Sequence, residues 1–152
     1  MRRMALALAL LSACAAAPAG PQERDLRASG TWEVFLWLEG QERPSGGQWV
    51  HLRCEGGVQT VLDDADGTIN GGFIRGTLAC WFGDDPNPRA VDWASPISGT
   101  HDLDTGHIEL RDGYCDYTGR MDGADRMAGT VRCNTDSGST QLDLNGTWEA
   151  TS

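Results

Sequence analysis

Histidine and cysteine are the side chains that most often bind metals or act as nucleophiles in proteins. This chain of 152 residues contains three histidines and five cysteines. The histidines fall in separate predicted strands without the close spacing of a zinc motif, and no two cysteines form a C-x-x-C pair. We therefore expect structural roles for these residues and no metal site. The three histidines are His51, His101 and His107.

Clusters of acidic residues are the other candidates for chemistry. The segment 63–67 has the Asp and Gly pattern that begins a calcium loop, but Arg75 stands where an EF-hand has its bidentate Glu. Two carboxylate pairs have the residue types of a glycoside hydrolase, although 15 Asp residues spread over turns make such pairs inevitable. These pairs are Asp84 with Asp85 and Asp102 with Asp104. We expect Asp-rich turns here.

Other catalytic patterns are missing as well. No Ser lies in a G-x-S-x-G elbow, and the absence of Lys removes Schiff-base and P-loop lysine chemistry. The 12 basic residues, all Arg, face 22 acidic ones, which gives a formal net charge of −10. We expect no nucleic-acid partner at this charge, because phosphate binding needs a basic stripe. The sequence predicts one domain that is not an enzyme and holds no cofactor.

The first residues have the pattern of a bacterial secretion signal. A basic start, Met1–Arg3, precedes an apolar run over 4–11 that is too short to span a bilayer. The tetrad Leu-Ser-Ala-Cys that ends at Cys14 resembles the lipobox of bacterial lipoproteins. The resemblance implies that residues 1–13 are removed and that Cys14 is lipidated. The alternative is an ordinary signal peptide cut after the stretch 13–17.

The following segment, 14–28, is rich in Ala, Pro and Gly and lacks apolar periodicity, which is typical of a flexible tether. We therefore expect a domain over 29–152 that is held at a membrane by its N-terminal lipid. Similarity to lipoproteins whose second mature residue is not Asp implies, through Ala15, sorting to an outer membrane. The predicted location is the bacterial cell envelope, facing the periplasm.

The domain itself has an all-β pattern of short alternating runs separated by Gly, Asp, Asn and Pro clusters. Gly56 and Gly57 leave open whether the second run is one bent strand or two. The Gly-Thr dipeptide occurs six times. Glycines at these positions would let strands bend into a closed barrel, because a missing side chain relieves crowding between neighbours. The expected strands are 31–38, 48–62, 68–82, 97–103, 107–112, 115–121, 126–133 and 140–149.

Cysteine parity predicts two disulfides in an oxidising compartment, since an even set remains once Cys14 is removed. A hairpin around the turn at 122–126 places Cys115 directly opposite Cys133. We predict a bond between these two, which leaves Cys54 to pair with Cys80. The second pairing requires bulges at Gly pairs to absorb a register offset.

Eight up-and-down strands bring the first and last strands together, so the barrel has two distinct ends. Trp32 and Trp148 are predicted to form its floor, together with tight Asp and Gly turns. Longer loops are expected at the opposite end, over 39–47, 83–96 and 134–139.

This pattern is similar to the lipocalin and avidin superfamily of small-ligand barrels, through Gly30-Thr31-Trp32 at the first strand and the expected Trp floor. The resemblance implies an open end where a ligand enters. We predict that an apolar or amphipathic ligand contacts aromatic residues near that end. The predicted contacts are Trp37, Trp81, Phe82 and Trp93.

Two alternatives remain open at the sequence level. A protein-docking or inhibitor module would use an acidic rim and the long loops 39–47 and 83–96. A structural envelope lipoprotein would need no ligand. The ligand-binding hypothesis requires an interior cavity, whereas the docking module requires a packed barrel and an exposed aromatic patch.

Overall fold

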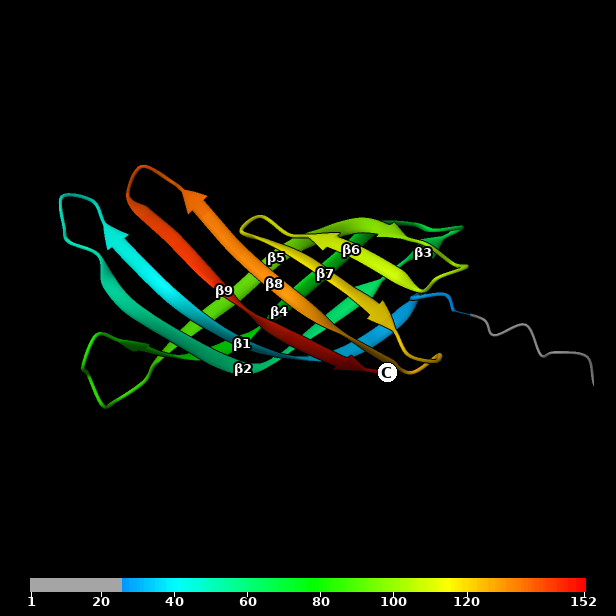
Figure 1. The fold of residues 1–152 in the computed structure, drawn as a ribbon, viewed down its shortest axis with the longest axis horizontal. Helices are drawn as coiled ribbons and strands as arrows, with labels where there is room; N and C mark the ends of the chain where they lie inside the picture. The colour runs from blue at the N-terminus through cyan, green and yellow to red at the C-terminus, as the bar shows by residue number, and fades with distance from the viewer. Residues whose placement is uncertain (1–25) are drawn as a thin grey trace, which may run out of the picture.

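Nine strands follow one another along residues 26–152, the part of the chain that the computed structural model describes, and no helix occurs among them (Figure 1). The predicted signal peptide, Cys14 and most of the tether lie outside the described residues. The strands are β1 (Gly30–Pro44), β2 (Val50–Leu62), β3 (Asp64–Ala65), β4 (Thr68–Phe82), β5 (Arg89–His101), β6 (His107–Arg111), β7 (Cys115–Met121), β8 (Arg126–Asp136) and β9 (Thr140–Thr151).

Antiparallel pairing closes the sheet on itself. Strands β4 to β9 pair each with the next, β9 pairs with β1, β1 with β2, and β2 with β4. The two-residue β3 adds only a short pairing to β4. The prediction of a single up-and-down barrel of eight strands is therefore confirmed, since β3 is an accessory to the eight that form the wall.

Alternation of side chains decides which residues fill the barrel. Along β1, Trp32, Val34, Leu36 and Leu38 are buried, while the residues between them are exposed. Trp32 and Trp148 are only 1% and 3% exposed. Trp148 lies opposite Leu36 in the β1–β9 ladder, so it sits further along the barrel than Trp32. Large apolar side chains from every wall strand complete this core.

Both predicted disulfides are present, Cys54–Cys80 and Cys115–Cys133. Each joins residues that face one another in neighbouring strands, with the sulfur atoms inside the barrel. The longer hairpin shows the predicted register offset, because its pairing slips by one residue between Val61–Phe73 and Asp64–Ile69. The β4–β5 pairing shifts at the same place in β4, between Ile69 and Gly72. Gly71 in this bulge has φ of 70°, which favours glycine.

The loop predictions are wrong in length. Strand β5 begins at Arg89, so the expected loop 83–96 shrinks to 83–88. The strand expected at 97–103 is instead β5, which starts earlier and ends at His101. Likewise, β1 continues to Pro44 and β8 to Asp136, which shortens the loops expected at 39–47 and 134–139. The reason is that backbone pairing with a neighbouring strand holds these polar stretches in place. The segment 48–62 is one strand that begins at Val50.

Asp64 fixes the point where the tether meets the barrel. Its buried carboxylate accepts hydrogen bonds from the N–H groups of Ala28 and Gly67, each at 2.9 Å, and lies 2.8 Å from His101 Nδ1. Trp32 Nε1 donates to the carbonyl of Ala28 at 2.8 Å. Burial by itself raises the pKa of Asp64, but these hydrogen bonds outweigh burial and hold the pKa below the ordinary value of 3.8.

A pH dependence of stability follows from Asp64. Because its pKa is lowered by folding, its contribution to the free energy of unfolding is complete above about pH 5 and is lost as the pH falls through the folded pKa. Substitution Asp64→Asn should cost about 1–3 kcal/mol at neutral pH. Urea unfolding of both chains from pH 7 to pH 2.5 should show the difference shrinking below about pH 4. A difference that stays constant over this range would contradict the role of the charge.

Candidate functional site

The four aromatic residues predicted to contact a ligand lie on two different surfaces of the barrel. Trp37 and Trp81 point outward, and Trp81 is covered by the guanidinium of Arg53, which lies 4.3 Å from the ring centroid. Phe82 and Trp93 point inward near the open end and pack against the core. The structure therefore does not bring these four residues together into one site.

Trp93 is held by a residue that the sequence analysis did not single out. Its Nε1 donates to the carboxylate of Asp112 at 2.9 Å, and the hydroxyl of Tyr117 donates to the same carboxylate at 2.9 Å. The N–H groups of Tyr114 and Cys115 donate to the second oxygen, each at 2.7 Å. Burial, together with the nearby carboxylate, raises the pKa of the Tyr117 hydroxyl. This cluster fixes the turn between β6 and β7 and restrains Trp93.

The best-formed surface feature lies on the outside of β1. Phe35 and Trp37 occupy successive outward positions, with ring centroids 4.4 Å apart. They are 37% and 41% exposed, although they stand in the middle of a regular strand. Gly57 is the partner of Phe35 in β2, so no side chain covers that side of the ring.

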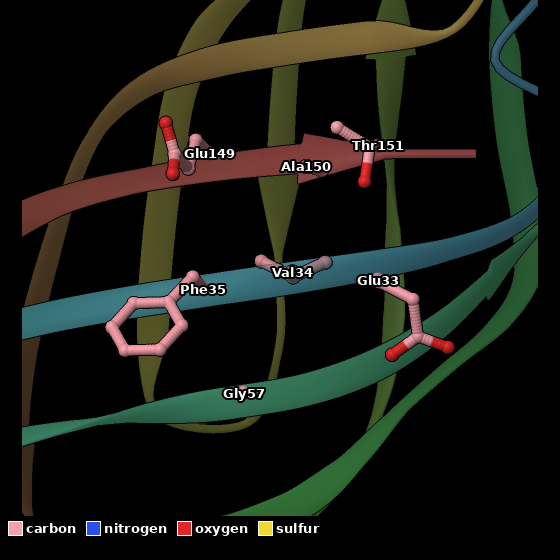
Figure 2. A pocket seen from close by; sticks show the side chains of 7 residues that line it. All are labelled: Glu33, Val34, Phe35, Gly57, Glu149, Ala150 and Thr151. Atoms are coloured by element: carbon pink, nitrogen blue, oxygen red, sulfur yellow. The ribbon is translucent and has the colours of Figure 1, made fainter.

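Figure 2 shows the hollow that results beside Phe35. It has a volume of about 220 Å³ and lies over the backbone of β1, between the side chains of Phe35, Glu33 and Glu149. Val34 and Ala150 point into the barrel, so only their backbone forms its base. The remaining lining residues are Gly57 and Thr151.

Glutamates surround the aromatic pair. Glu55 lies opposite Trp37 on β2, and Glu149 lies opposite Phe35 on β9. The next outward residues along β1 in the two directions are also glutamates. We call the two rings and these four residues the β1 aromatic face; the four are Glu33, Glu39, Glu55 and Glu149.

The contacts of these four glutamates are exposed, and Arg53 lies opposite Glu39 in the β1–β2 ladder. Gln59 donates to Glu33 at 2.8 Å, and His51 lies 3.0 Å from Glu39. Arg126 lies 3.8 Å from Glu149, and both side chains are about half exposed. Exposed pairs of this kind contribute little to stability, so the carboxylates can turn to another molecule.

Phe35 was missed in the sequence although a signal existed. Trp37 and Phe35 share one parity in β1, and that parity is opposite to Trp32 and Leu38, which the barrel pattern places inside. Assigning inward and outward positions would therefore have moved Trp37 to the outer wall and brought Phe35 beside it.

The described residues hold no group of three or more His, Cys, Asp or Glu side chains arranged to bind a metal ion. None of them forms a helix long and apolar enough to cross a membrane. What this arrangement can do chemically is bind another surface by apolar contact and charge. The chain matches no protein-family model, and neither the curated proteins nor the solved structures give a match.

Proposed function

We propose that this protein is a lipid-anchored, non-enzymatic module of the bacterial cell envelope that docks a basic protein partner on its β1 aromatic face. One observation carries the proposal: two aromatic rings in tilted contact, with 44° between their planes, are exposed in the middle of a barrel wall whose interior is filled by apolar side chains. A packed barrel with an exposed aromatic patch is what a docking module requires.

Aromatic pairs in such a position favour binding. Aromatic residues dominate the hot spots of protein interfaces, and burying a large apolar side chain contributes about 1.5–3 kcal/mol. The hollow beside Phe35 offers room for one side chain of a partner. The four glutamates around the rings select for Arg or Lys on that partner and repel an acidic surface.

The anchor and the location belong to the same proposal. A lipid on Cys14 and a tether over 14–28 would leave the barrel at Ala28, which Asp64 and Trp32 hold at one end of the barrel. The β1 wall would then extend away from the membrane into the periplasm. Two or three acyl chains give lasting attachment, whereas a single chain does not.

The anchor predicts a simple fractionation result. Substitution Cys14→Ser should move the protein from the membrane fraction to the soluble fraction, because no acyl chain can be attached. Membrane and soluble fractions of cells that express each chain would be compared by immunoblotting. Continued sedimentation of the Cys14→Ser chain with membranes would overturn the lipid anchor and leave the docking proposal standing.

Docking predicts a selective loss of binding. The double substitution Phe35→Ser/Trp37→Ser should weaken partner binding by at least tenfold, because truncating a hot-spot residue costs about 2 kcal/mol or more. A partner captured from periplasmic extract with the native chain would be purified and titrated by calorimetry. Trp49→Ser is the matched control, since Trp49 is equally exposed but lies outside this face.

Equal affinity of the native chain and the double variant would contradict docking on β1. Unfolding midpoints of all three chains should agree closely, because the substituted side chains are exposed. If native chains capture no partner at all, the docking proposal fails, and a structural envelope lipoprotein or a ligand-binding barrel remains.

A second candidate function is binding of a small apolar or amphipathic ligand at the open end. Four inward apolar side chains remain partly exposed there: Phe82, Val91, Trp93 and Leu142. The lipocalin resemblance implies the same kind of ligand. Native mass spectrometry of gently purified protein, followed by organic extraction, would reveal a bound molecule. Quenching of Trp fluorescence on rebinding would support this function.

A further inference from the structure

The backbone ladders between neighbouring strands do not all extend equally far toward the open end of the barrel. Strand β5 pairs with β4 from Arg89 to Thr100, but it pairs with β6 only over Ser98–His101. Among residues 26–152, no strand pairs with the other side of β5 from Arg89 to Ile97. Figure 1 shows the β6–β7 hairpin ending well short of the β4–β5 and β8–β9 hairpins.

The same interruption occurs across the barrel wall on β8. Its pairing with β9 reaches Asp136, but its pairing with β7 ends at Cys133. Two strands, β6 and β7, are thus missing between β5 and β8 at this height. Since neighbouring strands lie about 4.8 Å apart, the missing pair corresponds to roughly 14 Å between β5 and β8. Two extended strands would fill this width, so there is room for an extended chain to pair with β5.

The base of this interruption is rigid and aromatic. The β6–β7 turn is held by the Asp112 cluster, and the N–H of Gly113 donates to Ser95 Oγ on β5 at 2.8 Å. Tyr114 is 49% exposed and lies edge-on to Trp93, with ring centroids 5.8 Å apart. A hollow of about 250 Å³ adjoins the turn, lined by residues 111–116 and Asn134.

Free strand edges expose backbone donors and acceptors in a row. Every second residue of 89–95 directs its N–H and C=O away from β4, toward the missing strands. Proline at 96 has no N–H, so it ends the row next to the β6 pairing. Within 89–95, the side chains of Val91 and Trp93 point into the barrel and are partly buried and apolar. An occupant must therefore be an extended backbone that carries apolar side chains at alternate positions.

We propose that an extended segment of another polypeptide pairs with the free edge of β5 and adds a strand to the barrel. Backbone hydrogen bonds supply its affinity, and packing against Val91, Trp93 and Tyr114 selects its side chains. The chain's formal net charge of −10 favours a segment with basic residues. This site is independent of the proposed docking face, since β9 and β8 on one side, and β2, β4 and β5 on the other, separate β1 from the interruption.

Amide hydrogen exchange measured by NMR tests the proposal on the full chain carrying Cys14→Ser. The probe is the peptide acetyl-Arg-Thr-Val-Thr-Val-Thr-Arg-amide, and the matched control replaces both valines by proline, which cannot form the ladder. In the free protein, alternate amides of 89–95 should exchange at least tenfold faster than those that bond to β4. Saturation with the valine peptide should slow the fast set at least tenfold, and the proline peptide should leave it unchanged.

Three results would overturn the added strand. Slow exchange of all amides of 89–95 in the free protein would show that the chain already closes this edge. No slowing at millimolar valine peptide would show that the edge does not accept a strand. Equal slowing by both peptides would show binding without a ladder. Repeating the titration with Phe35→Ser/Trp37→Ser separates the two sites, because that variant should bind the peptide unchanged even if docking on β1 is lost.

Discussion

Removing the Cys115–Cys133 disulfide should lower the free energy of unfolding by about 3 kcal/mol, and removing Cys54–Cys80 should have a similar effect. The bonds close loops of 18 and 26 residues in sequence separation, which makes the expected entropic contributions nearly equal. A domain of this size has a total stability of about 5–15 kcal/mol, so a chain that lacks both bonds should be close to unfolding at 37 °C.

Urea unfolding of Cys115→Ala/Cys133→Ala and of Cys54→Ala/Cys80→Ala, each with the other bond intact, would measure both contributions. Reduced native chain is the control that retains all four sulfur atoms and so separates the lost crosslink from lost packing. The first pair should have an added local effect, because the crosslink holds in place the strand end whose backbone N–H, at Cys115, donates to Asp112. Faster amide exchange in the β6–β7 turn would report it. Unchanged midpoints in both variants would contradict the stabilising role.

Parts of this fold could be predicted because they depend on local pattern. The hairpin that pairs Cys115 with Cys133 has a short turn and strict alternation, so its register follows from the sequence. The turn at 63–67 has the Asp and Gly residues that such turns need. Strand β5 was half missed because its first residues lie among Pro, Asn and Asp residues that are typical of loops. Pairing with β4, the preceding strand of the same hairpin, overrides that local preference.

The candidate site was less predictable than the fold, for a physical reason. Aromatic residues are used both in cores and at interfaces, and only their side of the sheet distinguishes the two roles. The sequence predicts both Trp93 and Trp37 as ligand contacts, yet Trp93 is hydrogen-bonded to Asp112 inside the barrel and Trp37 stands on its surface. The hydrogen bond from Trp93 to Asp112 spans 19 positions in the sequence, and no local spacing indicates it. Once the strands are known, the alternation of side chains along each strand decides which aromatic residues face the core and which face the surface.

Gly146→Ala should be among the most damaging single substitutions, with a cost of about 3 kcal/mol or more. A Cβ at this position would overlap the carbonyl oxygen of Trp37 in the neighbouring strand β1. Because that oxygen belongs to the backbone of a closed barrel, it cannot move aside without separating β1 from β9. Three other Gly-Thr glycines inside strands are crowded in the same manner: Gly76, Gly99 and Gly129. The repeated dipeptide therefore marks places where neighbouring strands come unusually close.

Gly57→Ala provides the matched control, since a Cβ at this position has nothing within 4 Å. That substitution should change stability by less than about 1 kcal/mol and could raise it by restricting the unfolded chain. Urea midpoints of the native chain and the two variants would decide the matter. Equal costs at both positions would show that backbone flexibility, and not close approach, explains the glycines. A large cost at Gly146 alone would identify crowding between strands as the constraint that keeps this dipeptide in the barrel wall.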